Sequence, residues 1–276
     1  MPVIKLRDGA ELFYKDWGKR DGPIVTFSHG WPLSSDNWEN QMVFLAERGY
    51  RVIAHDRRGH GRSTQTWDGN NMDTFVDDLK ELFEYLDVKD AVMVGHSHGG
   101  GEVTRFLGKH GTSRVKKAVL VCAVPPLMLK TSSNPEGLDK SVFDSFREAM
   151  HKDRAQFFLD VPNGPFFGFN RPDAKKSEGQ VWSWWKQGMN TSFKTAYDAI
   201  KDFSETDFTE DLKRIDIPVL VLHGDDDQVV PFEASGKKSA QLLPNGTLKV
   251  YPGGSHAIHN INVDEVNQDL LKFIQS

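Results

Sequence analysis

The stretch Ala91-Val-Met-Val-Gly-His-Ser-His-Gly-Gly-Gly101-Glu-Val-Thr-Arg-Phe-Leu107 decides the fold. Its first four residues form an apolar run that is typical of a buried strand, and the residues from Glu102 onwards have the composition of a helix. Between them, small residues allow a tight turn that projects the side chain of Ser97 from the end of the strand. A plain strand-to-helix turn with an ordinary serine is the alternative, because a Gly-x-Ser-x-Gly pattern also occurs by chance.

Short apolar runs and amphipathic stretches alternate along the rest of the chain. This alternation is typical of strand–helix–strand units, which build a mostly parallel sheet flanked by helices. The expected strands are Val3–Leu6, Glu11–Trp17, Ile24–Ser28, Arg51–His55, Ala91–Gly95, Lys117–Ala123, Val219–His223 and Leu248–Tyr251. The expected helices are Trp38–Glu47, Asp73–Leu86, Gly100–His110, Phe232–Leu243 and Val263–Ile274. The predicted fold class is therefore α/β, with a mostly parallel eight-stranded sheet whose first two strands form an antiparallel hairpin.

The interval 125–216 interrupts this alternation with helical segments, prolines, glycines and many aromatic residues. We expect a helical cap here, inserted into an α/β core of residues 1–124 and 217–276. The aromatic side chains either only hold the cap together or also line an apolar pocket where the cap meets the sheet, since small-molecule clefts favour such boundaries. The expected lining residues are Trp31, Pro32 and Val230 from the core and Phe158, Phe166 and Trp184 from the cap.

The composition excludes several classes of protein. Of the 276 residues, 38% are hydrophobic and 26% are charged, which is typical of a soluble globular domain. The 34 Lys and Arg residues are outnumbered by 39 Asp and Glu residues and form no basic block, so nucleic acid is not an expected partner. The sequence shows neither a secretory signal nor an apolar run that could cross a membrane, so we expect a cytoplasmic protein. A single cysteine, Cys122, excludes an internal disulfide and favours an inert, buried side chain.

A serine hydroxyl is a poor nucleophile near neutral pH, so Ser97 needs a base and a group that orients the base. Both kinds of residue follow expected strands further along the chain. The carboxylates Asp225-Asp-Asp227 come shortly after one strand, and His256 lies on a glycine-rich turn after the last strand. All these strands place their following residues at the same edge of the sheet. The chain order Ser, Asp, His is that of α/β-hydrolases.

Neighbouring residues offer other interpretations. His259 lies three residues beyond His256 and is the alternative base, although it is farther from the strand end. His96 and His98 have a His-x-His spacing that can bind a metal, but side chains on either side of a tight turn diverge and no third ligand is evident. The aspartate triplet 225–227 is alternatively a solvated acidic loop or a weak cation site. We expect no metal and no other cofactor.

Acyl transfer also requires two backbone N–H groups that bind the developing oxyanion. His98, the residue after the candidate nucleophile, supplies one of them. The segment Ser28-His-Gly-Trp-Pro32 follows an expected strand, and its His-Gly turn can aim the amide of Trp31 into the site. Pro32 has no N–H and restricts Trp31 to extended conformations, or else it only begins a turn.

Together these segments resemble the α/β-hydrolase superfamily, and within it the family of cofactor-free haloperoxidases, perhydrolases and arylesterases. The resemblance covers nearly the whole chain and is weakest across the cap. It is carried by His29-Gly-Trp-Pro32, Asp56-Arg-Arg-Gly-His-Gly-Arg-Ser63, Met72-Asp-Thr-Phe75, Gly95-His-Ser-His-Gly-Gly-Gly101 with Glu102, and Gly224-Asp-Asp-Asp-Gln-Val-Val-Pro231.

The resemblance implies a role for each candidate residue. Ser97, Asp227 and His256 correspond to the nucleophile, the acid and the base of the family, because its acid stands just before the Gln-Val-Val-Pro segment. The family's oxyanion donors correspond to the amides of Trp31 and His98. Haloalkane dehalogenases and epoxide hydrolases share the His-Gly-Trp-Pro segment but use an aspartate nucleophile, where this chain has serine.

Three positions depart from the family pattern. His98 stands where methionine is frequent, so we expect it to add a titrating group near the mouth of the site. Ala257 follows the base in place of glycine, and Asp226 stands in the acidic triplet where glycine is common.

The expected function is that of a serine hydrolase that cleaves small, apolar carboxylic esters through an acyl-enzyme. The resemblance adds a perhydrolase activity of the cofactor-free haloperoxidase kind, and lactams are a further acyl substrate. A carbon–carbon bond hydrolase of ring-cleavage products would need basic residues inside the cap, where the aromatic stretches offer only Arg154, Arg171 and Lys186. A non-enzymatic ligand-binding protein with the same fold is a third interpretation. The expected partners are small-molecule esters and peroxide, with no membrane contact, and homo-oligomerisation is left open.

Overall fold

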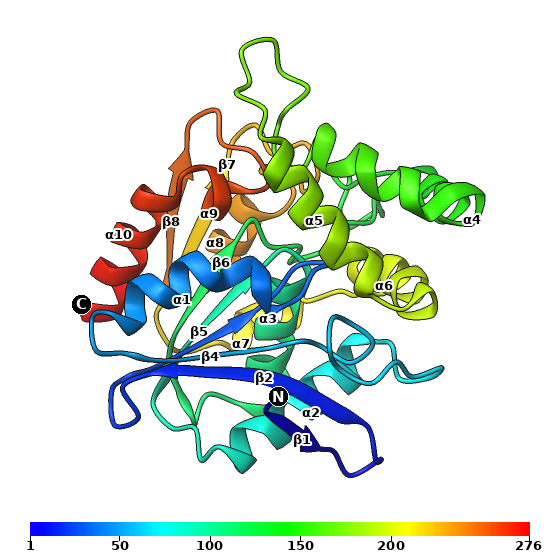
Figure 1. Ribbon diagram of the computed structural model, residues 1–276. Helices are drawn as coiled ribbons and strands as arrows, with labels where there is room; N and C mark the ends of the chain where they lie inside the picture. Colours follow the sequence, from blue (N-terminus) through cyan, green and yellow to red (C-terminus); the bar gives the residue numbers. More distant parts are fainter.

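The computed structural model describes residues 1–276 and is built around one sheet of eight strands (Figure 1), in the order β1-β2-β4-β3-β5-β6-β7-β8. The strands are β1 (Val3–Lys5), β2 (Glu11–Gly18), β3 (Ile24–Ser28), β4 (Arg51–His55), β5 (Ala91–His96), β6 (Val115–Val121), β7 (Val219–Gly224) and β8 (Gly246–Tyr251). β1, β2 and β4 pair antiparallel, and every pair from β4 to β8 is parallel. The α/β class and the mostly parallel eight-stranded sheet predicted from the sequence are confirmed.

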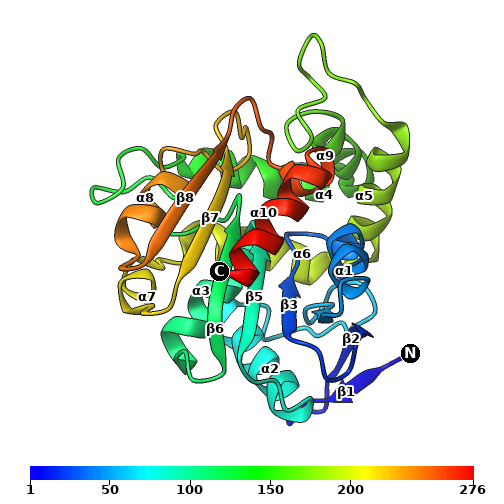
Figure 2. The same cartoon turned by 90° about the vertical axis from the view of Figure 1, so that its left-hand side faces the viewer.

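Helices cover both faces of the sheet. One layer contains α1 (Glu39–Ala46) and α10 (Val263–Gln275), which pack against each other, and Figure 2 shows α10 crossing in front of the strands. The other layer contains α2 (Met72–Tyr85), α3 (His98–His110), α7 (Thr209–Arg214) and α8 (Gly236–Leu242). Two short elements, the 3-10 helix η1 (Ser35–Trp38) and α9 (Ile258–Ile261), join strands to helices.

Each face of the sheet has its own apolar core, because successive side chains of a strand point to opposite faces. In β5, Val92 and Val94 pack in the core that includes Leu270 of α10, whereas Met93 packs in the core that includes Phe106 of α3. Every residue of β5 and β7 is buried, as is typical of central strands in a parallel sheet. These two strands therefore give rigid support to the residues that follow them.

The interval between β6 and β7 contains α4 (Lys140–Asn163), which is kinked at Asp153, then α5 (Glu178–Asn190), α6 (Phe193–Glu205) and α7. Helix α4 packs against both α5 and α6, and all three lie outside the two helical layers (Figure 1). We refer to these three helices as the cap. α7 instead packs against α3 and α8. No helix of the structure is both long and apolar enough to cross a membrane.

Strand β6 begins and ends two residues earlier than the sequence pattern predicted. Val115 pairs with β5, and the chain leaves the sheet at Cys122, which has a positive φ of 44°. The apolar run extends to Val124 because these residues are buried after the strand has ended. The chain therefore stays buried after it has stopped pairing in the sheet.

Candidate active site

Ser97 stands alone between the end of β5 and the start of α3, with φ 54° and ψ −122°. A positive φ is strained for a residue with a side chain and is held only by tight surroundings. A Cβ atom on Gly95 would lie 2.3 Å from the carbonyl oxygen of Gly99, and one on Gly99 would lie 2.2 Å from the carbonyl oxygen of Ser28. Only glycine therefore fits on both sides of the turn. The turn directs the Ser97 side chain into a cavity.

Asp227 lies in the loop after β7, and its carboxylate is held on both oxygens. Oδ1 accepts hydrogen bonds from the amides of Val229 (2.9 Å) and Val230 (2.8 Å), and Oδ2 accepts one from Nδ1 of His256 (2.8 Å). Burial raises the pKa of Asp227, but the charge of His256 and the hydrogen bonds of His223 and His256 outweigh burial and hold that pKa well below its usual range. The carboxylate is therefore ionised.

The other two aspartates of the triplet are exposed and face different partners. Asp225 accepts a hydrogen bond from the amide of Gly253 (2.6 Å), and Asp226 forms an ion pair with Arg171 (2.6 Å). Of the three carboxylates, only that of Asp227 contacts His256.

His256 follows β8 and is buried, with its ring edge-on to Phe166 (centroids 5.2 Å apart). Because the Asp227 carboxylate only accepts hydrogen bonds, Nδ1 of His256 carries a proton, which leaves Nε2 as the basic nitrogen. His256 and Ser97 line the same cavity. No hydrogen bond joins their side chains in the structure, and such bonds are often long until a substrate binds.

Two free amides lie beside Ser97. His98 is the first residue of α3, so its N–H has no partner within the helix. The amide of Trp31 donates to no protein atom. The peptide before Trp31 is close to the serine, since a Cβ atom on Gly30 would lie 3.2 Å from Cβ of Ser97. This arrangement can bind an oxyanion that forms at a carbonyl attacked by Ser97.

The cavity that contains Ser97 and His256 has a volume of about 350 Å³ and lies between the sheet edge and the cap. Four of the residues expected to line it do so: Trp31, Phe166, Trp184 and Val230. The cavity wall is mostly apolar, which suits an uncharged substrate of low polarity.

Pro32 and Phe158, which were also expected at the cavity, lie behind its wall. The Phe158 ring is fully buried, edge-on to both Trp31 and Trp184 (centroids 5.7 Å apart in each case). The Pro32 ring packs toward α5, where a Cβ atom on Gly188 would lie 3.3 Å from it. Both side chains therefore support the lining residues without reaching the cavity.

Most of the cap side chains in the wall were missed by sequence reasoning. They are Val142, Phe143, Phe146 and Val161 of α4 and Phe203 of α6. Their three- and four-residue spacing along α4 marks an apolar helix face, which is the signal that could have found them. That signal alone does not say whether the face meets other helices or a cavity.

The side chain of His98 does not reach the mouth of the site, and the expectation that it adds a titrating group there is wrong. It is fully buried and contacts Asp202 (Nε2 to Oδ2, 2.7 Å) and Arg57 (Nδ1 to Nη1, 3.2 Å). Burial, together with the charge of Arg57, lowers the pKa of His98 and keeps it neutral. The side chain points away because the elbow directs Ser97 and His98 to different sides.

The rings of His96 and His259 lie against each other (centroids 4.2 Å apart), and neither side chain lines the cavity. His96 donates from Nε2 to the backbone carbonyl of His256 (2.9 Å), so it faces away from His98. His259 is fully buried against Trp38, its Nε2 is hydrogen-bonded to the side-chain nitrogen Nδ2 of Asn37 (2.8 Å), and it does not line the cavity. The alternative base is thus separated from the site.

One cluster near the site contains residue types that bind metals. Ligand atoms of Cys122, Asp227 and His256 all lie within 4.8 Å of one another and are buried. Oδ2 of Asp227 and Nδ1 of His256 are bonded to each other (2.8 Å), and Sγ of Cys122 donates to the carbonyl of Ser255 (3.7 Å). Hydrogen bonds within the protein therefore already use all three atoms.

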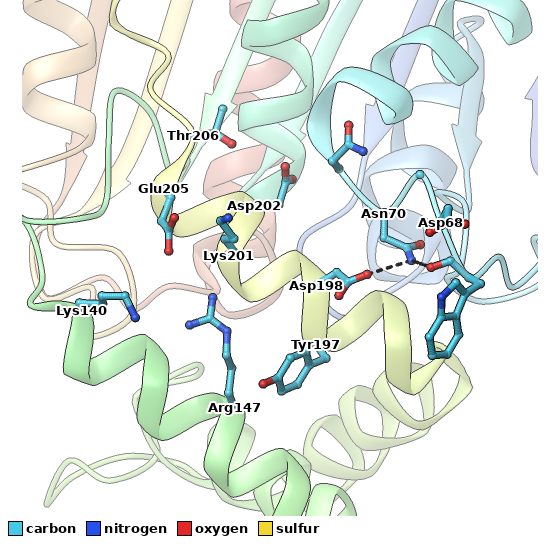
Figure 3. Close-up of a pocket in the computed structure, with 13 residues that line it drawn as sticks. Asp68, Asn70, Lys140, Arg147, Tyr197, Asp198, Lys201, Asp202, Glu205 and Thr206 are labelled. Atoms are coloured by element: carbon cyan, nitrogen blue, oxygen red, sulfur yellow. Dashed lines mark hydrogen bonds between the residues drawn. The ribbon is translucent and has the colours of Figure 1, made fainter.

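A second, larger cleft of about 850 Å³ lies at another boundary of the cap and is polar (Figure 3). Lys140 and Arg147 of α4 face Lys201 and Glu205 of α6 across it. Neither Ser97 nor His256 borders this cleft, and its charges are of both signs.

The chain is similar to known proteins in both sequence and structure. Residues 23–262 match the family model described as alpha/beta hydrolase fold. The chain is 57% identical to a bifunctional esterase/perhydrolase of Acinetobacter calcoaceticus and 58% identical to a non-heme chloroperoxidase of Burkholderia pyrrocinia, over the full length of all three chains. A solved bromoperoxidase from Bacillus anthracis is 40% identical, with a TM-score of 0.95 over 100% of this chain and 99% of that one.

Proposed function

Because the chain belongs to the alpha/beta hydrolase fold family, we propose that it is a serine esterase for small, apolar carboxylic esters that also makes peracids from hydrogen peroxide. The observation that supports this most directly is that Ser97, on its strained elbow, lines the same apolar cavity as His256, which is bonded to Asp227. The relatives with esterase, perhydrolase and haloperoxidase names support the same chemistry.

In the proposed first half-reaction, Oγ of Ser97 attacks the ester carbonyl while Nε2 of His256 takes the hydroxyl proton. Asp227 holds the imidazole in the required tautomer and stabilises its positive charge. The amides of Trp31 and His98 bind the oxyanion of the tetrahedral intermediate. His256 then returns the proton to the leaving alcohol, and the acyl group stays on Ser97.

In the second half-reaction, His256 activates water, which releases the carboxylic acid, or hydrogen peroxide, which releases a peracid. The carbonyl oxygen of Trp31 accepts no hydrogen bond from the protein, while the next carbonyl, that of Pro32, is held by Oγ1 of Thr191 (2.7 Å). We assign the free Trp31 carbonyl as the acceptor that favours peroxide. Peracids oxidise halide ions in solution, which accounts for a haloperoxidase reaction. Lactams can acylate Ser97 by the same steps.

The cavity does not suit a carbon–carbon bond hydrolase with an anionic substrate. Arg154, Arg171 and Lys186, the cap cations that such a reaction would need, do not line it. The lining contains no Lys or Arg side chain.

The decisive experiment is Ser97→Ala, assayed with 4-nitrophenyl acetate. We expect kcat to fall by at least about a thousandfold, because the nucleophile is lost while the oxyanion donors remain. Covalent labelling by a fluorophosphonate should disappear in the same variant. Retention of a tenth of the wild-type rate in folded protein would contradict the proposal and favour the ligand-binding interpretation.

Pro32→Leu tests the perhydrolase part. We expect the ratio of peracid formation to ester hydrolysis to fall by about tenfold, the equivalent of one hydrogen bond of about 1.4 kcal/mol. Hydrolysis of the same ester in the same reaction serves as the internal reference. An unchanged ratio would show that the Pro32 segment has no part in the choice between water and peroxide.

A further inference from the structure

We propose that Arg57 is a positioning residue that holds the two halves of the oxyanion hole together. Its side chain is fully buried beyond the end of β4. One guanidinium nitrogen, Nη2, donates to the carbonyl of His29 (2.5 Å), and the other, Nη1, donates to Nδ1 of His98 (3.2 Å). His29 begins the segment that supplies the Trp31 amide, and His98 supplies the second amide. The inference therefore rests on the proposed function of these amides.

The first half of the hole is tied to Arg57 by two bonds. Besides the bond to the His29 carbonyl, the backbone amide of Arg57 donates to Nε2 of His29 (3.0 Å). Nδ1 of His29 in turn donates to the carbonyl of Gly30 (2.8 Å), the residue before Trp31. Through these hydrogen bonds Arg57 holds the His29–Trp31 loop in its conformation.

The second half is held between Arg57 and the cap. Because Nδ1 of His98 accepts from Arg57, its Nε2 carries the proton and donates to Asp202 of α6 (2.7 Å). The other carboxylate oxygen of Asp202 accepts from the amide of Met72 at the start of α2 (2.7 Å). The residue after the nucleophile is therefore fixed from the core and from the cap.

The charge of Arg57 is balanced within the protein. Nη2 lies 3.2 Å from Oε2 of Glu102, whose Oε1 is 3.1 Å from Nε2 of His55. Burial raises the pKa of Glu102, but Arg57 and His55 outweigh it and hold the pKa well below its usual range. Removing only one member of a buried ion pair leaves an uncompensated charge and is strongly destabilising. A variant must therefore keep the charge or remove both charges.

Arg58 provides a matched control. It is the next residue, it is also buried, and it also forms ion pairs, with Asp78 (2.7 Å) and Asp8 (2.6 Å). These partners lie outside the oxyanion segments. A lysine at either position keeps the charge but loses the planar fork that reaches two acceptors at once.

The experiment compares Arg57→Lys with Arg58→Lys in the full chain, using 4-nitrophenyl acetate and a boronic acid that forms a tetrahedral adduct with Ser97. For Arg57→Lys we expect kcat to fall about 10- to 100-fold with KM within about threefold, and the boronate Ki to rise by a similar factor, because an interaction made in the transition state is weakened. For Arg58→Lys we expect kcat and the boronate Ki within about threefold of wild type, with a lowered Tm.

The double variant Arg57→Gln/Glu102→Gln removes both buried charges and gives a second test if Arg57→Lys does not fold. It should show the same paired loss of kcat and boronate affinity. Either folded variant with at least half the wild-type kcat would overturn the proposal, and so would an equal loss in Arg58→Lys. If the proposed function itself fails, wild-type protein will neither cleave the ester nor bind the boronate, which is a different outcome.

Discussion

Asp160 is the one carboxylate on the wall of the apolar cavity. It lies exposed on α4, its Oδ1 accepts from Nε2 of Gln156 (2.8 Å), and no ion pair neutralises it. A single negative charge at the rim repels substrates that carry a carboxylate and leaves neutral esters unaffected. We therefore expect Asp160 to disfavour anionic substrates.

We predict that Asp160→Asn raises kcat/KM for an ester with a free carboxylate, such as a 4-nitrophenyl hemisuccinate, by about three- to tenfold. This corresponds to about 1 kcal/mol for two charges that are about 4 Å apart in water. The gain should shrink at high salt, and 4-nitrophenyl acetate should be unaffected. Glu148→Gln makes the same charge change on α4 outside the cavity and should change neither rate. A gain that is equal for both esters would contradict this role.

Helix α3 contributes its dipole to the site. It begins at His98, directly after Ser97, so the positive end of its dipole points to the place where the oxyanion forms. Lys109 in its last turn complements the negative end. The helix can approach this closely because Gly95 and Gly99 remove the side chains that would keep it away.

The tight packing of α3 makes a prediction about Gly99→Ala. Its new Cβ would lie 2.2 Å from a backbone carbonyl of β3, so the elbow must shift. We expect a loss of about 2–4 kcal/mol in the free energy of unfolding and a fall in kcat of at least about a hundredfold.

Gly179→Ala is the control for that variant. On α5, the added Cβ would meet no atom closer than 3.9 Å. Alanine there should stabilise the helix by up to about 1 kcal/mol and leave kcat unchanged. Denaturant unfolding and the ester assay measure both variants, and an active, stable Gly99→Ala protein would contradict the steric argument.

We expect the buried histidines to make the free energy of unfolding depend on pH under acid conditions. Burial is the main cause that lowers the pKa of five of them: His29, His60, His96, His98 and His259. The pKa of His259 is lowered to about 3. In the unfolded chain, histidine titrates near pH 6.5. Below that pH the unfolded state binds more protons than the folded state, so stability falls as pH falls.

We predict that the free energy of unfolding decreases from pH 6.5 to pH 4 by up to about 1.4 kcal/mol per pH unit for each such histidine. Asp227 and Glu102, whose pKa values are held low in the folded chain, add a loss of the same sign below about pH 4. His259→Gln should lower the slope by up to about 1.4 kcal/mol per pH unit, because one buried histidine is removed. A stability that is flat between pH 6.5 and pH 4 would contradict this prediction.

Features that depend on contiguous residues could be predicted from the sequence. The apolar runs predicted all eight strands, and the pattern around Ser97 predicted the turn between β5 and α3. Asp227 and His256 were placed after their strands in the right order, and the structure brings the two into contact. These features follow from local sterics and from the rule that strands of a parallel sheet place their ends at one edge.

Long-range packing determines which side chains of those segments meet. It turned the α4 face with Phe143 and Phe157 toward the cavity and left Phe158 behind the wall. It also paired His98 with Asp202, 104 residues away, and placed Arg57 between the two oxyanion segments. The physical reason is that periodicity gives a helix an apolar face, whereas the rotation of that helix against the core depends on packing between residues far apart in the chain.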